Sequence, residues 1–203
     1  RPVIDNLPAA ITAYVGAGQC SVPVQWAAIT ASDNCTGTQV QTSHLNGGIF
    51  AVGTTTVTVT ARDGSNNLRT GSFTVTVADT VSPVFSNIPA MFTIVPDSQS
   101  CGATVSWVEP FAVDNCGTPV ITKTHTPGST FPVGNTVVSY TATDAYNNST
   151  TINFTVVVRD EVAPAINWRG GGRDIIVAAD NGRCDASVTF SVPVATDNCS
   201  GVT

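Results

Sequence analysis

Hydrophobic and polar residues alternate along short segments of the first part of the chain. The alternating segments are 11–15, 21–26, 39–43, 48–52, 56–61 and 72–77. Alternation is typical of a β-strand with one buried face, because successive side chains of a strand point to opposite faces. It is strictest at 56–61 and 72–77, and the residues between them, Arg-Asp-Gly-Ser-Asn-Asn at 62–67, predict a turn. We find no helical periodicity of useful length, so the pattern predicts an all-β protein.

The same pattern occurs again 81 residues later, where Asp33-Asn34-Cys35 falls on Asp114-Asn115-Cys116. Other residues that coincide at this offset are Pro2 and Pro83, Trp26 and Trp107, His44 and His125, Phe50 and Phe131, Asp63 and Asp144, and Phe73 and Phe154. A third copy carries two extra residues near Gly171 and reaches Asp197-Asn198-Cys199 after a further 83 residues. Coincidence at so many positions in one register predicts a tandem repeat.

The predicted copies are residues 1–79, 80–160 and 161–203. Each complete copy has six or seven short strands separated by Gly, Pro and Asn, which predicts tandem immunoglobulin-like β-sandwich repeats. The third copy is the N-terminal half of a sandwich, so we expect the natural protein to continue. Trp26, Trp107 and Phe190 are expected to anchor the cores, and Trp168, beside the insertion, is the candidate for an exposed contact.

Composition narrows the class of partner. The chain has a net charge of −6 and only eight Lys and Arg residues, which are scattered. Binding to nucleic acid needs clustered cations, and we therefore expect none. No run of 18 apolar residues occurs, so we expect no membrane insertion.

Six cysteines form three pairs, each separated by 15 positions: Cys20 and Cys35, Cys101 and Cys116, and Cys184 and Cys199. Structural zinc sites use four ligands in closely spaced pairs, which this spacing does not provide. We therefore predict one disulfide within each repeat, closing a loop that stabilises the fold by about 3 kcal/mol. Disulfides also indicate an oxidising compartment and hence an extracellular or cell-surface protein.

Acidic residues recur where an immunoglobulin-like fold brings the end of one repeat against loops of the next. The candidates at these junctions are Asp79, Asp114, Asp144, Asp160, Glu161 and Asp197. Calcium takes six to eight oxygen ligands, so clustered carboxylates could bind it and stiffen the array. The alternative is that Asp33, Asp63 and their equivalents form Asx-turns by hydrogen bonding to their own backbone. No other cofactor is expected.

Catalysis is not indicated. His44 and His125 are equivalent positions in different repeats, and a Ser-His-Asp arrangement needs all three groups within hydrogen-bond reach. We therefore predict that the protein is not an enzyme. Candidate glycosylation sites are Thr80, in the three-residue signal Asp79-Thr80-Val81, and the sequon residues Asn148 and Asn153.

Several of these motifs together resemble the hyalin repeat, or HYR domain. They are Asp-Asn-Cys after a Trp-bearing strand, Gly-Ser-Thr-Phe-Pro-Val-Gly at 128–134, Tyr-Thr-Ala-Thr-Asp at 140–144 and Phe-Thr-Val-Val-Val at 154–158. The resemblance covers the whole chain and implies an immunoglobulin-like fold used in extracellular matrix and complement-like proteins of animals and in surface adhesins of gliding bacteria. A second cysteine pair often found in that family is absent, and Leu7, Gly71, Ile88 and Ile152 occupy the corresponding positions. A bacterial surface adhesin therefore fits at least as well as an animal matrix protein.

The leading hypothesis is a structural or adhesive stalk or filament of a large secreted or cell-surface protein. Its partners would be neighbouring repeats of the same chain, other copies in a filament, or ligands of the cell surface or matrix. Each linker, 78–83 and 158–164, ends in proline, which restricts the backbone and predicts a semi-rigid array. The alternatives are a binding module for a carbohydrate or protein, and accessory domains of a secreted enzyme.

Overall fold

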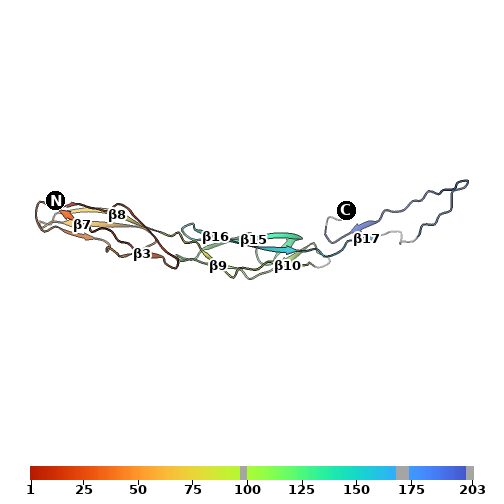
Figure 1. Cartoon of the computed structure of the whole chain (residues 1–203), viewed down its shortest axis with the longest axis horizontal. Helices are drawn as coiled ribbons and strands as arrows, with labels where there is room; N and C mark the ends of the chain where they lie inside the picture. The colour runs from red at the N-terminus through yellow and green to blue at the C-terminus, as the bar shows by residue number, and fades with distance from the viewer. Residues whose placement is uncertain (97–99, 168–173, 200–203) are drawn as a thin grey trace. The chain divides into compact units, whose positions relative to one another are not determined.

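A computed structural model describes residues 1–96, 100–167 and 174–199 (Figure 1). The chain forms two compact units. The first contains Arg1–Ile88, Pro110–Lys123 and Tyr140–Ile152, and the second contains Pro89–Glu109, Thr124–Ser139 and Asn153–Thr203. The predicted boundary between the first two repeats therefore lies inside the first unit, and that unit contains the whole first repeat together with strands and loops of the second. The described residues contain strands and no helix, so the all-β class is confirmed.

The first repeat is a two-layer sandwich of the immunoglobulin-like kind. Its strands are β1 (Val3–Ile4), β2 (Ile11–Tyr14), β3 (Ser21–Pro23), β4 (Ala31–Ser32), β5 (Gln39–Thr42), β6 (Ile49–Ala51), β7 (Gly53–Arg62) and β8 (Leu68–Ala78). One sheet has the order β2-β8-β7-β5, with β2 parallel to β8 and the other pairs antiparallel. The pairs β3-β6 and β1-β4 supply the remaining strands. The long strands β7 and β8 lie side by side (Figure 1).

The core of the first sandwich follows from the alternation in β7 and β8. Val57, Val59, Val75 and Val77 are almost completely buried, whereas the residues between them are more exposed. Complete burial of one such side chain stabilises the fold by about 1.5–3 kcal/mol. Trp26 packs edge to face on Phe73, with ring centroids 5.2 Å apart, and also contacts Phe50. The expected role of Trp26 as a core anchor is confirmed.

The second repeat has the same strands in the same order: β9 (Val84–Ser86), β10 (Phe92–Ile94), β11 (Gly102–Val105), β12 (Phe111–Val113), β13 (Val120–Lys123), β14 (Ser129–Pro132), β15 (Gly134–Thr143) and β16 (Ser149–Val158). Its four-stranded sheet has the order β10-β16-β15-β13. Trp107 is buried and packs against Phe92, Phe131 and Phe154. The last two are equivalent to Phe50 and Phe73, which Trp26 contacts in the first repeat.

The described part of the third repeat contains only the pair β17 (Ala165–Asn167) and β18 (Val194–Thr196). This pair is equivalent to β9 and β12, which pair in the same way. Phe190 was expected in the core, but its side chain is 67% exposed, because no second layer covers it among the described residues. Trp168 and the glycines beside it lie outside the described residues.

The turns between β7 and β8 and between β15 and β16 position the acidic residues. Asp63 Oδ1 accepts hydrogen bonds from the backbone N–H groups of Ser65 and Asn67, and Asn67 Nδ2 donates to Asp63 Oδ2. Asn66 has a φ of 68°, and its equivalent Asn147 has the same value. Asparagine tolerates this left-handed conformation better than most residues. The turn interpretation of Asp63 is therefore confirmed.

Apolar packing occupies the position of the absent cysteine pair in the first repeat. A Cβ atom added to Gly71 would lie 3.2 Å from Leu7 Cδ2 and 3.3 Å from Ile4 Cδ1. The Leu7 side chain thus covers the glycine backbone closely.

Candidate functional site

A disulfide joins Cys20 of the first repeat to Cys116 of the second, 96 residues apart in sequence. The two Cα atoms are 4.9 Å apart, within the usual range for a disulfide. Cys20 lies in the loop between β2 and β3, and Cys116 lies in the loop that follows β12. The predicted pairing of Cys20 with Cys35 is therefore wrong, and Cys35 is an exposed free thiol.

The geometry of the sandwich explains the error. The N–H of Val15 donates to Ala78 O, so the loop that carries Cys20 starts at the end of the sandwich where β8 finishes. Cys35 precedes β5, whose first residue Gln39 pairs with Arg62, at the far end of β7. Ten residues of a strand span about 33 Å, so the two cysteines of one repeat lie at opposite ends of it.

The second unit contains the equivalent bond. Cys101 is joined to Cys199, 98 residues apart, with Cα atoms 4.9 Å apart. The predicted pairs of Cys101 with Cys116 and of Cys184 with Cys199 are therefore wrong as well, and Cys184 is exposed and free. Both bonds connect the first cysteine of one repeat to the second cysteine of the next.

Three aspartates gather beside the Cys20–Cys116 bond. Asp79 follows β8, Asp114 follows β12 and Asp144 follows β15, and one carboxylate oxygen of each lies within 4.8 Å of the other two. The predicted approach of Asp79 to Asp114 and Asp144 is confirmed. We refer to these three residues as the acidic junction.

Each aspartate of the acidic junction is held in place by local hydrogen bonds. Asp79 Oδ1 accepts from the Val81 N–H at 3.0 Å and from Asn115 Nδ2 at 3.3 Å. Asp114 Oδ2 accepts from the Cys116 N–H at 2.9 Å. Asp144 Oδ1 accepts from the N–H groups of Tyr146 and Asn148, and Asp144 Oδ2 accepts from Asn148 Nδ2. The turn interpretation thus holds for Asp114 and Asp144 as well.

Three buried oxygen atoms at the junction have no hydrogen-bond partner: Asp79 Oδ2, Asp114 Oδ1 and Asn115 Oδ1. Asp79 is only 6% exposed. Buried polar atoms in folded proteins are nearly always hydrogen-bonded, so three unpartnered oxygens at one place are unusual. Asn115 Nδ2 donates to Gln19 O at 2.7 Å and to Asp79, which fixes the amide with its oxygen on the unpartnered side.

The pKa of Asp144 lies below its ordinary value. Burial raises this pKa, but the hydrogen bonds from the Asn148 side chain and from the backbone N–H groups of Asn148, Tyr146 and Asn147 outweigh that effect. The pKa of Asp63 is lowered as well, mainly by the hydrogen bond from the Asn67 side chain, with burial acting in the opposite direction. Both carboxyl groups are therefore ionised at neutral pH.

The second unit brings Asp160 close to Asp197, as predicted, with the Cys199 sulfur also within 4.8 Å. Asp160 Oδ1 accepts from the Val162 N–H and Asp197 Oδ1 from the Cys199 N–H, both at 3.0 Å. Asn198 Nδ2 donates to Ser100 O, and Asn198 Oδ1 is buried without a partner. Glu161 is exposed and does not belong to this group.

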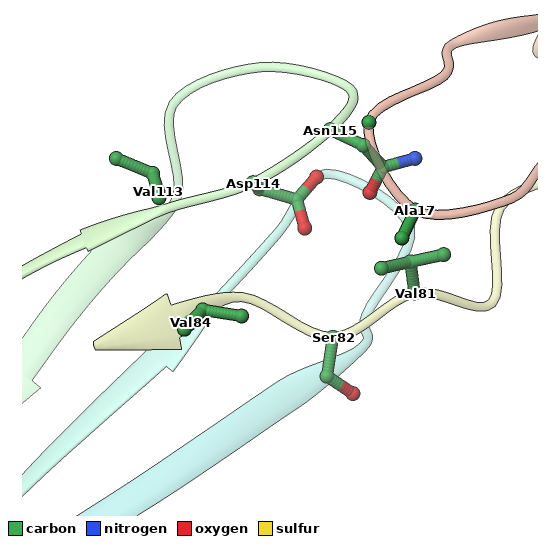
Figure 2. Close-up of a pocket in the computed structure, with 8 residues that line it drawn as sticks. Ala17, Val81, Ser82, Val84, Val113, Asp114 and Asn115 are labelled. Carbon is green, nitrogen blue, oxygen red and sulfur yellow. The ribbon is translucent and has the colours of Figure 1, made fainter. Parts of the chain in front are cut away.

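A cavity of about 220 Å³ lies beside the acidic junction in the first unit. Figure 2 shows Asp114 and Asn115 on the loop after β12, with Val81 and Ser82 on the segment that leads into β9, around the same cavity. The other lining residues are Val84, Val113 and, from the Cys20 loop, Ala17 and Gly18. The Cys20 loop of the first repeat, the linker and the loop after β12 of the second repeat thus line one small surface.

The remaining candidates differ in accessibility. Asn148 is a poor glycosylation site in the folded chain, because its Nδ2 donates to Asp79 O and to Asp144 Oδ2. Thr80 and Asn153 are exposed, and their glycosylation stays a prediction. The His44 and His125 rings lie 5.4 and 5.2 Å from Phe50 and Phe131, and each ring also contacts the hydroxyl group of the preceding residue.

Sequence reasoning missed Asn115, Asn198 and the carbonyl group of Gln19. The signal was present in the motif Asp-Asn-Cys, which occurs in all three copies. The predicted junction contacts involved its aspartate and the predicted disulfides its cysteine, whereas the central asparagine is the residue that hydrogen-bonds to the preceding repeat. The part of the chain that the structure describes holds no helix that could span a membrane.

Comparison with known proteins places these features in context. The profile of the HYR domain matches residues 1–77 and 78–158. The chain is 37% identical to hyalin of Lytechinus variegatus over 97% of its length, and it covers 38% of that protein. It is 37% identical to hyalin of Strongylocentrotus purpuratus over 97% of its length, covering 17% of that protein.

A third relative is the sushi, von Willebrand factor type A, EGF and pentraxin domain-containing protein 1 of Mus musculus. It is 32% identical over 91% of the chain, which spans 5% of that protein. These relatives and the two disulfides agree with the predicted extracellular location. The comparisons do not support the predicted bacterial origin.

Proposed function

Because the chain belongs to the HYR domain family, we propose that it is a non-enzymatic structural and adhesive segment of a larger extracellular repeat protein. In this proposal it acts as a stalk or filament in which each repeat is bonded covalently to the next. The observation that carries the proposal is the pair of disulfides Cys20–Cys116 and Cys101–Cys199, both of which link consecutive repeats.

A cross-link between repeats suits a protein that holds other structures together. The linker at residues 78–83 already connects the first two repeats, and the disulfide adds a second covalent connection beside it. Closing a loop of 96 residues stabilises the folded chain by about 4.7 kcal/mol in the chain-entropy model. That exceeds the roughly 3 kcal/mol of a 15-residue loop, because the longer loop removes more conformations from the unfolded chain.

The two free cysteines extend the same proposal. Cys35 is equivalent to Cys116, and Cys184 is equivalent to Cys101 and Cys20. Both thiols are exposed, so each is available to a further repeat of the same type. In this arrangement the array has one disulfide at every junction, and the repeats serve as each other's principal partners.

Digestion of the oxidised chain with trypsin tests the proposed connectivity. Cleavage after Arg62, Arg69, Lys123 and Arg183 places the cysteine pairs on peptides 1–62, 70–123 and 184–203. Bonds between repeats should hold these three peptides together as one product, which separates after reduction. Three separate peptides without reduction would mean that the bonds lie within repeats, and the proposed covalent array would be wrong.

A further inference from the structure

We propose that the acidic junction binds a calcium ion between the first two repeats. This metal site goes beyond the proposed structural role, which needs only the disulfides. Two independent observations support it: three carboxylates lie within 4.8 Å of one another, and Asp79, which is 94% buried, has an oxygen without any partner.

Electrostatics favours a cation at this position. Three carboxylates in mutual proximity repel each other, and the repulsion is strong where burial excludes water. The ion pairs Arg1–Asp33 and Arg183–Asp185 do not involve a residue of the junction. A bound divalent cation would neutralise most of the three negative charges.

The available ligand atoms are oxygens. The backbone hydrogen bonds use Asp79 Oδ1 and Asp114 Oδ2, which leaves Asp79 Oδ2 and Asp114 Oδ1 for a ligand. Asn115 supplies a third free oxygen, and its amide is already held in the required orientation by Gln19. The turns thus fix the carboxylates without consuming these atoms, so turn formation and metal binding are compatible.

The chemistry of these ligands selects calcium among the common divalent cations. Zinc in structural sites is bound by thiolate and imidazole ligands, and the nearby Cys116 sulfur is part of a disulfide. Calcium accepts six to eight carboxylate, amide, backbone and water oxygens in flexible geometry, whereas magnesium requires a near-ideal octahedron. Oxygens from three separate loops fit the more permissive ion.

The equivalent position in the second unit has a partial set of the same ligands. Asp160, Asp197 and Asn198 correspond to Asp79, Asp114 and Asn115, and Asn198 Oδ1 is again buried without a partner. The cysteine sulfur in this group is also part of a disulfide and is not a thiolate ligand. We therefore expect this second group, with two carboxylates, to bind calcium more weakly than the acidic junction.

The test compares calcium binding of the oxidised full chain with that of two charge-matched variants. Asp79→Asn removes one negative charge from the junction, and Asp5→Asn removes one from an exposed position of the same repeat. After removal of metals with EDTA, calorimetric titration and thermal unfolding are measured with CaCl2 and with equal MgCl2. Calcium at about 10 mM should raise the unfolding temperature of the wild type and of Asp5→Asn by about 5 °C, given the weak affinities usual for extracellular sites.

Asp79→Asn should lose this rise and the stronger of the two binding events. An equal response of Asp79→Asn and wild type would overturn the assignment, as would a wild-type response to calcium no larger than that to magnesium. If Asp79→Asn does not fold, the site is tested instead in the wild type, by NMR of the side-chain amide resonances of Asn115. They should shift with calcium and not with magnesium, and resonances unmoved by calcium would refute the site.

Discussion

Two faces built from the same residues can be compared within the first unit. One carries Asp33, Asn34, Cys35, Asp63 and Asn67 in the first repeat, and the other carries Asp114, Asn115, Cys116, Asp144 and Asn148 in the second. In the second face, Cys116 is bonded to Cys20, and the two asparagines donate to Gln19 O and Asp79 O. In the first face, the Cys35 thiol is exposed and free. We call the face of the first repeat the open face and the face of the second repeat the closed face.

The hairpin at the two faces has the same geometry although only one face is closed. Asp63 and Asp144 each accept two backbone N–H groups and one asparagine side chain, and the turn residues Asn66 and Asn147 have equal φ values. Each repeat therefore builds this part of its face from its own residues. The preceding repeat adds a cysteine, an aspartate and the carbonyl groups of Gln19 and Asp79. The face is therefore preorganised, and docking costs little ordering.

The largest expected difference between the faces comes from their cysteines. Replacing both Cys20 and Cys116 by serine should destabilise the chain by about 4–5 kcal/mol, because the loop of 96 residues is no longer closed in the unfolded state. Cys35→Ser on the open face is the matched control and should change stability by less than about 0.5 kcal/mol. Urea unfolding monitored by tryptophan fluorescence measures both, and equal midpoints for the two variants would contradict the comparison.

Acid should weaken the hairpins of both faces. Since the pKa values of Asp63 and Asp144 are lowered in the folded chain, their ionised forms stabilise it fully above the unfolded-state pKa of about 3.9. This stabilisation is lost as the pH falls through the lower folded-state values. The unfolding temperature should therefore drop more steeply below pH ~4 in the wild type than in Asp63→Asn with Asp144→Asn. Parallel curves would mean that neither carboxyl group contributes.

The smallest expected difference concerns the asparagines of the two hairpins. Asn148→Ala removes a hydrogen bond to Asp144 and a second one to Asp79 O, whereas Asn67→Ala removes only the bond to Asp63. Asn148→Ala should therefore cost about 1 kcal/mol more than Asn67→Ala. Chemical denaturation of the two variants measures the difference, and an equal loss would indicate that the contact to Asp79 contributes nothing to stability.

The sequence predicted the fold well wherever side chains alternate over several residues. It missed β1 and β4, because a strand of two residues is too short to show a period. It also extended β3 to Trp26, whereas the strand ends at Pro23. Near Trp26 the Asn46 side chain replaces a partner strand by accepting from the Trp26 N–H and donating to the Trp26 carbonyl.

For the candidate site, the sequence predicted which aspartates meet but not which cysteines bond. Immunoglobulin-like topology places certain loops at a common end, so Asp79, Asp114 and Asp144 could be brought together by reasoning alone. The cysteines recur with the period of the repeat, and the pattern is equally regular for bonds within a repeat and between repeats. Deciding between them required knowing that Cys20 and Cys35 lie at opposite ends of one sandwich.

The overlap of the two disulfide loops has a mechanical consequence. The loop closed by Cys20–Cys116 contains Cys101, so tension on the ends of the chain is carried by a covalent shortcut. This covalent path runs over 19 residue steps from residue 1 to Cys20, crosses to Cys116, and returns over 15 steps to Cys101. It then crosses to Cys199 and runs over 4 steps to residue 203, so it uses 38 of the 202 steps in the chain. At about 3.5 Å per residue, the chain could be drawn out to about 130 Å rather than about 700 Å, even with every sandwich unfolded.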